Sequence, residues 1–357
     1  MDIKEFTRPE LEAWLLERGE KPFRARQILK WVHQKGTTTF AAMTDLSASL
    51  RELLNQELTI ARLTQSHVAP AADGTRKYLF TLADRRRIES VLIPADDRLT
   101  LCISSQVGCA MGCRFCATAQ VRPVRDLTAG EIVSQVWEVQ QSLSPDRRLT
   151  NIVFMGMGEA LANYDQVTKA LSIITSEWGL NFSPRRVTVS TVGLAPQMRR
   201  LVEESPVNLT VSLTATTDRT RDDLMPINRR YPLEQLLDTC RSLPLIPRKR
   251  LTFAYTMLDG VNDSEEDARR LVKLLHGMRA KVNLIPFNSF PGTPFRSTPR
   301  PRIERFRQAL LDHGVQATIR ESRGQDVQGA CGQLAAQNPH PDPLPLARAR
   351  EKIPSPL

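Results

Sequence analysis

The spacing of hydrophobic residues predicts that the chain begins with helices. Over the first 65 or so residues, apolar side chains recur at helical intervals in three segments, 11–19, 23–36 and 46–58, with Gly and Pro between them. This pattern predicts a small helical N-terminal domain over residues 1–66.

The pattern then changes to short β-rich segments. Residues 77–82 and 87–94 are rich in β-branched and aromatic side chains, and their alternation predicts a hairpin-like pair of strands. We therefore predict a β-rich connecting segment over residues 67–99, leading into the main body of the chain.

From residue 100 to about 320, strand-like and helix-like segments alternate. The predicted strands are 100–105, 151–156, 186–191, 207–213, 250–258 and 281–287. The predicted helices are 132–143, 164–179, 195–204, 232–243, 264–277 and 302–314, the first preceded by a capping box of Thr128 and Glu131. Six βα units in a row predict an α/β domain with a parallel sheet, either doubly wound or curved into a barrel. In both architectures, functional residues gather at the carboxyl ends of the strands.

The segment 336–357 is rich in Pro and has no apolar periodicity, which predicts a disordered C-terminal tail.

Composition narrows the class of protein. With 41% hydrophobic and 25% charged residues among 357, the chain is neither globally disordered nor fibrous. Its 49 Lys and Arg exceed its 39 Asp and Glu by 10, which favours polyanionic partners. Neither a long apolar run nor a leader-like start is present, so we expect a soluble, cytoplasmic protein without membrane contact.

Three of the six cysteines crowd into the loop after the first strand of the alternating region. Cys109, Cys113 and Cys116 have the spacing C-x3-C-x2-C, and three thiolates can converge on one metal centre. A structural zinc site needs a fourth ligand, such as Cys102 or a distant residue. Three cysteines holding a 4Fe-4S cluster instead leave one iron free for a substrate or cofactor. The spacing alone leaves both centres open.

With Phe115 before its last cysteine, this motif resembles the hallmark of the radical S-adenosylmethionine (SAM) superfamily. Further segments resemble the adenine-C2 RNA methyltransferases of the RlmN type, within the RlmN/Cfr family. They are LCISSQVGCAMGCRFCATAQ, FMGMGEALAN, DDLMPINRRYP, LDGVNDSEEDA, KVNLIPFNSFPG and SRGQDVQGACGQLA, and the resemblance runs from about residue 2 to 335.

The resemblance implies a fold and a set of cofactors. The fold is a partial (β/α)6 radical SAM barrel over residues 100–335, and the cofactors are a 4Fe-4S cluster on Cys109, Cys113 and Cys116 and S-adenosyl-L-methionine. The residues implied in binding S-adenosylmethionine are Gly158, Glu159, Ser190, Ser212, Leu213, Thr214 and Asn288, with Glu159 near its amine. The chain departs from the family pattern at Ala160, usually Pro, and at Thr214, usually His.

The resemblance also implies the roles of three catalytic residues. Cys331 is first methylated and then loses a hydrogen atom to a 5′-deoxyadenosyl radical, so that its methylene radical adds to C2 of the adenine. Cys102 resolves the adduct by forming a transient disulfide with Cys331, which fits a reducing compartment. Glu89 matches an acidic residue assigned as a proton acceptor.

The implied partners are 23S ribosomal RNA, transfer RNA and an electron donor such as flavodoxin, and we expect a monomer. A target adenosine that must leave its stack points to a flipped base in a loop of folded RNA. Two alternatives stay open, namely a C8-adenine methyltransferase of the Cfr type and a non-catalytic zinc RNA-binding protein.

Overall fold

A computed structural model describes residues 1–122, 124–246 and 249–336. The predicted tail over 336–357 therefore lies outside the described residues, except for Ala336. Within the described part, ten strands form one sheet in the order β1-β2-β3-β4-β7-β8-β9-β10-β11-β12. These strands are β1 (Thr64–Pro70), β2 (Arg76–Thr81), β3 (Arg87–Ala95), β4 (Arg98–Cys102), β7 (Asn151–Phe154), β8 (Val187–Thr191), β9 (Asn208–Ser212), β10 (Leu251–Met257), β11 (Ala280–Pro286) and β12 (Gln316–Ile319), while β5 (Gln106–Val107) pairs with β6 (Arg125–Asp126) separately.

The sheet has an antiparallel part and a parallel part. Strands β1 to β4 form an antiparallel meander, and every pair from β4 through β7 to β12 is parallel. The predicted hairpin over 77–82 and 87–94 is confirmed as β2 and β3. Because β3 pairs with β4, the segment predicted as a connection continues the sheet of the barrel.

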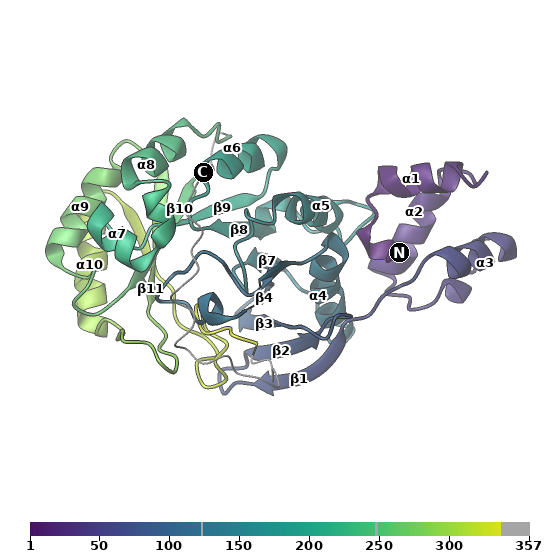
Figure 1. Cartoon of the computed structure of the whole chain (residues 1–357), viewed down its shortest axis with the longest axis horizontal. Coiled ribbons are helices and arrows are strands. Elements are labelled where there is room, and N and C mark those ends of the chain that lie inside the picture. The colour runs from purple at the N-terminus through teal and green to yellow at the C-terminus, as the bar shows by residue number, and fades with distance from the viewer. Residues whose placement is uncertain (123, 247–248, 337–357) are drawn as a thin grey trace.

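Helices cover the outer side of this curved sheet (Figure 1). They are α4 (Ala129–Gln141), α5 (Tyr164–Thr175), α6 (Ala195–Glu204), α8 (Leu233–Ser242), α9 (Glu265–Leu275) and α10 (Arg300–Asp312). The predicted capping box opens α4, where the Thr128 hydroxyl accepts a hydrogen bond from the Glu131 amide. Since β1 and β12 are the two ends of the strand order, the predicted partial barrel is confirmed as an open one.

Among the elements that escaped the sequence prediction are β1, α7 (Asp218–Leu224) and β12, besides the two-residue strands β5 and β6. Strand β1 is mostly exposed along its length and so lacks a buried alternate face. Helix α7 is short and buries two residues, and β12 has four residues. Each is too short or too polar for its hydrophobic pattern to stand out.

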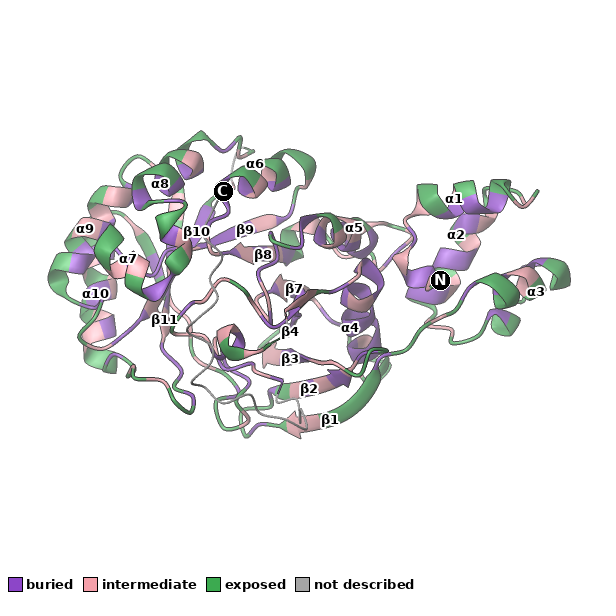
Figure 2. Ribbon diagram, in the orientation of Figure 1, coloured by how far each residue is buried: buried purple, intermediate pink, exposed green. Residues whose placement is uncertain are grey.

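The N-terminal helices form a domain with its own core. Helices α1 (Arg8–Leu16), α2 (Arg24–Leu29) and α3 (Ala48–Glu57) enclose it, with the short helical turns η1 (Ile3–Glu5), η2 (Lys30–Gln34) and η3 (Phe40–Ala42). The other short turns are η4 (Ala117–Gln120), η5 (Pro184–Arg186) and η6 (Pro226–Arg229). Figure 2 shows the buried faces of the helices turned toward one another in this domain and toward the sheet in the barrel.

Contacts to α4 fix this domain against the barrel. The indole Nε1 of the buried Trp137 donates to the carbonyl of Val32 at 2.7 Å, and Arg62 binds both oxygens of Glu138 at 2.7 Å. In the described part of the chain, every helix is too short or too polar to cross a lipid bilayer.

Candidate active site at the carboxyl ends of the strands

The loop after β4 carries the three clustered cysteines. Their thiols lie close enough to interact electrostatically, Cys113 with both Cys109 and Cys116. Burial raises the pKa of all three, that of Cys109 to about 12. Without a cation the thiols therefore stay protonated at neutral pH, and a bound metal centre would supply the charge that makes them thiolates.

The donor set of this loop fits an iron–sulfur cluster. In the described residues, no group of three or more His, Cys, Asp or Glu side chains surrounds a position for one metal ion. A 4Fe-4S cluster makes a different demand, because each cysteine ligates a separate iron. Three neighbouring thiols on one loop meet that demand.

Glu159 lies beside the cysteines at the end of β7. It is 3% exposed, and its carboxylate accepts hydrogen bonds from the amides of Leu161 at 3.1 Å and Val192 at 2.9 Å. Burial raises its pKa, whereas these hydrogen bonds lower it. Glu159 also raises the pKa of Cys109 and Cys113, so it presents an oriented carboxylate next to the cluster loop.

The other predicted cofactor residues lie near the ends of the next strands. Ser190 and Ser212 are half-buried in β8 and β9, and Leu213 is fully buried just after β9. Thr214 has φ of +56°, which is uncommon for a β-branched residue. Its hydroxyl is buried without a hydrogen-bond partner among the described residues. Such an orphaned group fits a site completed by a polar ligand.

Gly158 has a structural task as well. Its φ is +98°, and a Cβ atom would lie 2.6 Å from the Cβ of Gln106. Only Gly allows this approach of the β7 end to the loop that follows β4. The Gln106 side chain then accepts a hydrogen bond from the Glu159 amide at 2.8 Å.

Arg221 on α7 is a site residue that sequence reasoning missed. It is fully buried, and its guanidinium donates to the carbonyls of Val192 at 2.7 Å and Leu213 at 3.2 Å. Burial lowers its pKa to about 10, with an opposing contribution from Cys113. This arginine ties together the ends of β8 and β9. Sequence reasoning missed Arg221 because it did not predict the short helix α7.

A C-terminal loop brings Cys331 to the loop that carries Cys109, Cys113 and Cys116. The carbonyl of Gly332 accepts a hydrogen bond from the Ala117 amide at 2.7 Å, and Cys331 is close enough to raise the pKa of Cys116. Asn288, which follows β11, donates from Nδ2 to the carbonyl of Cys331 at 3.1 Å. The yellow C-terminal segment in Figure 1 accordingly runs back across β2 to β4.

Cys102 faces the same loop from the end of β4. Burial and the neighbouring Cys331 raise the pKa of Cys102 to about 12. Arg320, directly after β12, interacts electrostatically with both thiols. Cys331 makes the largest contribution to the raised pKa of this arginine, and Cys102 adds to it. The structure thus places two thiols and one guanidinium together. Arg320 was missed because β12 was missed.

Glu89 on β3 holds the far end of the loop. It is 5% exposed and forms an ion pair with Lys77 at 3.0 Å. Its Oε2 accepts hydrogen bonds from the amides of Ala335 at 3.0 Å and Ala336 at 3.1 Å. Glu89 is therefore a buried, paired carboxylate attached to the segment that carries Cys331.

Comparison with known proteins places the chain among characterised families. Residues 1–60 match the family described as "Ribosomal RNA large subunit methyltransferase N-terminal domain", and residues 103–272 match the radical SAM superfamily. A relative from Syntrophotalea carbinolica is 53% identical over 335 residues, covering 94% of this chain and 89% of its own length. A relative from Geobacter sulfurreducens is 53% identical over 334 residues, covering 94% and 92%. Both are named dual-specificity RNA methyltransferase RlmN.

A solved structure shares the whole fold. The crystal structure of a radical SAM methyltransferase from Sphaerobacter thermophilus has a TM-score of 0.89 and 44% identity, covering 94% of this chain and 100% of that one.

Proposed function

The chain belongs to the RlmN family of dual-specificity RNA methyltransferases, and from that membership we infer that it methylates C2 of adenosine in 23S ribosomal RNA and transfer RNA. It is a radical SAM enzyme that uses a 4Fe-4S cluster and S-adenosylmethionine. The observation that carries the mechanism is the position of the Cys331 loop, which is bonded to the cluster loop through Ala117 and faces Cys102.

Cys109, Cys113 and Cys116 hold the cluster in this proposal. When bound, the cluster and S-adenosylmethionine supply a methyl group and a one-electron cleavage of the sulfonium. Glu159 orients the amine of the cofactor, since its carboxylate is fixed by two backbone amides and lies beside the cysteines. The hydroxyls of Ser190, Ser212 and Thr214, with Asn288, offer further polar contacts.

Cys331 is the methyl carrier and Cys102 the resolving thiol. The sulfur of Cys331 bears the carbon that becomes bonded to C2 of the adenine. The thiolate of Cys102 then attacks that sulfur. As the S–S bond forms, the S–C bond breaks, its electron pair goes to the carbon attached to C2, and that carbon takes up a proton to become the methyl group. Burial keeps Cys102 protonated until it acts, and the guanidinium of Arg320 stabilises the thiolate once the proton leaves.

Glu89 is proposed as the acceptor of the C2 proton. Its carboxylate is buried next to the loop and forms an ion pair with Lys77 at 3.0 Å. The amides of Ala335 and Ala336 bind Oε2 and the ammonium of Lys77 pairs with Oε1, so Oε1 would have to leave Lys77 to accept the proton.

An electron donor, an oligomeric state and a cellular compartment complete the proposed function. We propose that a small one-electron donor such as flavodoxin reduces the cluster and that the enzyme works as a monomer in the cytoplasm. A disulfide that must reopen in every cycle is suited to a reducing compartment.

Product analysis tests the proposed function. The reconstituted enzyme would be incubated anaerobically with RNA, S-adenosylmethionine and a reductant, and the RNA digested to nucleosides. We expect 2-methyladenosine with wild type and none with Cys331→Ala. Finding 8-methyladenosine alone would establish the alternative of C8 methylation. A colourless zinc-containing preparation without turnover would instead support the non-catalytic alternative.

A further inference from the structure

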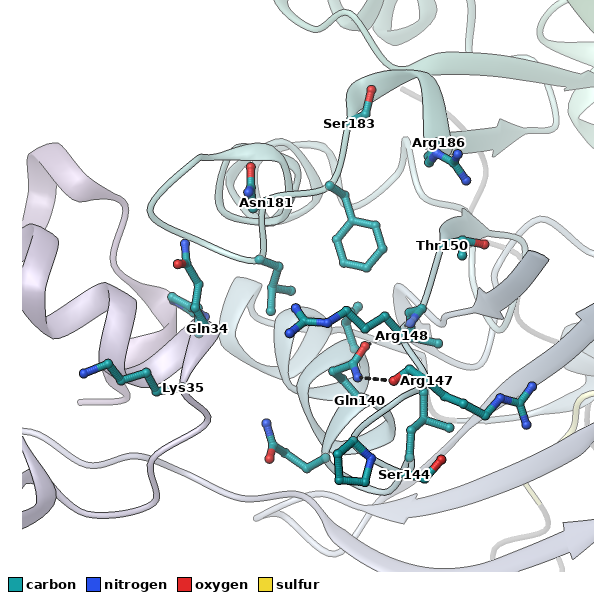
Figure 3. A pocket seen from close by; sticks show the side chains of 18 residues that line it. Gln34, Lys35, Gln140, Ser144, Arg147, Arg148, Thr150, Asn181, Ser183 and Arg186 are labelled. Atoms are coloured by element: carbon teal, nitrogen blue, oxygen red, sulfur yellow. Dashed lines mark hydrogen bonds between the residues drawn. The ribbon is translucent and has the colours of Figure 1, made fainter. Parts of the chain in front are cut away.

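A polar groove lies between the N-terminal domain and the barrel, away from the cysteines. Its volume is about 890 Å³, and Figure 3 shows it between η2, the end of α4 and the loops that precede β7 and β8. Thr150 and Arg186 line it, and they directly precede β7 and β8. The groove is therefore at the amino edge of the parallel strands, opposite the carboxyl edge that carries Glu159 and the cluster loop.

The charge of this groove is one-sided. Lys35, Arg147, Arg148 and Arg186 line it, all four are exposed, and none forms an ion pair with a described residue. Its lining contains no Asp or Glu. The nearby Asp146 is the acid that interacts with Arg147. The ammonium of Lys35 lies over the ring of Trp31 at 3.3 Å, which leaves Arg148 and Arg186 without a charged or aromatic partner among the described residues.

Other ion pairs in the molecule show how unusual this is. Arg269 and Arg270 on α9 each bind the acidic side chain of Glu266 one turn earlier on the same helix. Uncompensated cations around a hollow repel one another, and an anion bound there would relieve that repulsion.

The remaining lining suits nucleotides. The amide of Asn181 offers a donor and an acceptor, and the Oε1 of Gln34 offers an acceptor, while the Nε2 of Gln34 and both ends of the Gln140 amide already bind backbone groups. The half-exposed Phe182 offers a ring on which a base can stack. Arg forms bidentate hydrogen bonds with phosphate. Cations, amides and one aromatic ring around a groove of this size are typical of a surface that follows a polynucleotide backbone.

We propose that this groove binds the sugar–phosphate backbone of the substrate RNA at nucleotides remote from the adenosine that is methylated. The inference rests on the proposed function for the identity of the RNA. The distance is within reach, since the five residues of β8 separate the two edges of the sheet by about 17 Å. A folded RNA that inserts one base at the carboxyl edge can therefore continue around the N-terminal domain to the opposite edge.

Binding experiments with two RNAs test this second contact. The variant of the groove, called the pocket variant below, is Arg148→Gln/Arg186→Gln. It removes two exposed cations that make no side-chain bond to the described residues. The matched control is Lys273→Gln/Arg305→Gln, which removes the same charge from exposed positions on α9 and α10 that likewise make no side-chain bond to the described residues. The probes are a complete transfer RNA transcript and the isolated hairpin of its anticodon arm, each measured by fluorescence anisotropy over a range of salt concentrations.

For the complete transcript, we expect the pocket variant to bind about tenfold more weakly, with the slope of log Kd against log salt reduced by about two. Hairpin binding should be unchanged, and the control variant should resemble wild type with both RNAs. Equal affinity of the pocket variant and wild type for the complete transcript would overturn the proposal. So would an equal loss with the hairpin or with the control variant, since that reports only net charge. A wrong functional assignment can be distinguished from a wrong assignment of the groove. If the proposed function is wrong, the wild-type enzyme will methylate neither RNA, whatever the binding results.

Discussion

Asn288 holds the backbone of Cys331. Its Nδ2 donates to the carbonyl of Cys331 at 3.1 Å, and its Oδ1 accepts a hydrogen bond from Gln325 at 2.7 Å. Both ends of this buried amide are thus bonded to the loop that presents the thiol. Asn288, which the family resemblance implies as a cofactor contact, therefore also positions Cys331.

Replacing Asn288 by Ala should therefore slow the methylation of Cys331. Each lost hydrogen bond contributes about 1 kcal/mol, so we expect the rate to fall roughly tenfold or more. The measurement is mass spectrometry of the Cys331 peptide over time, at equal iron content. Asn283→Ala is the control, because Asn283 lies on β11, five residues before Asn288, but accepts a hydrogen bond from Thr318 instead. A similar loss in both variants would contradict the positioning role.

His33 should make stability depend on pH. It is 6% exposed, and neither ring nitrogen has a hydrogen-bond partner among the described residues. Burial, with repulsion from Lys4, lowers its pKa from 6.5 to about 3. The folded state therefore disfavours the protonated imidazole. Above pH 6.5 His33 is neutral in both the folded and the unfolded state and does not lower the free energy of unfolding. Between pH 6.5 and pH 3 its titration lowers that free energy by about 1.4 kcal/mol per pH unit as the pH falls.

Urea unfolding at pH 7, 6 and 5 measures this dependence. The free energy of unfolding of His33→Leu should fall less steeply with pH than that of wild type. His313→Leu, at an exposed position, should keep the slope of wild type. Parallel slopes for wild type and His33→Leu would show that the imidazole does not contribute.

The cluster assignment predicts different outcomes for two buried cysteines. Cys113→Ala removes a proposed ligand, so reconstituted protein should lose most of its iron and all cleavage of S-adenosylmethionine. Cys240 is equally buried, but it lies on α8 and packs in the barrel core. Cys240→Ala should keep both iron and cleavage. Full iron content and activity in Cys113→Ala would refute the ligand assignment.

The hydrophobic pattern predicted a parallel α/β domain because its strands are buried and its helices amphipathic, and the family resemblance then implied the barrel rather than a doubly wound sheet. The six strands from β4 to β11 along the parallel sheet and the capping box before α4 all carry such a signal. Strand β12 alternates between exposed and buried positions over only four residues, which gives little periodicity to detect. The local pattern of hydrophobic residues therefore predicted elements in proportion to their length and burial.

The site was predictable where chemistry lies in a short motif. Cys109, Cys113 and Cys116 are close in sequence, so their spacing alone indicated a metal centre. Arg221 and Arg320 act through contacts with carbonyls and thiols from other strands. Nothing in their neighbouring sequence distinguishes them from the many exposed arginines. Only the folded chain shows that Arg221 is buried at the strand ends and that Arg320 lies beside the two thiols.

The strongest test of the mechanism separates Cys331 from Cys102, because their proposed roles belong to different steps. Cys331→Ala lacks the methyl carrier, so it should bind the cluster but form neither methylated protein nor an RNA adduct. Cys102→Ala keeps the carrier and lacks the thiol that resolves the adduct, so RNA should stay covalently attached.

Denaturing gels reveal this difference directly. Cys102→Ala incubated with RNA and S-adenosylmethionine should give a shifted, nuclease-sensitive band that Cys331→Ala does not give. Cys240→Ala again serves as the control and should turn over without a trapped band. Because Cys102 is buried beside Cys331 and Arg320, no other cysteine among the described residues is placed to replace it except those of the cluster loop. An adduct with Cys331→Ala, or normal turnover by Cys102→Ala, would show that carrier and resolving thiol are wrongly assigned.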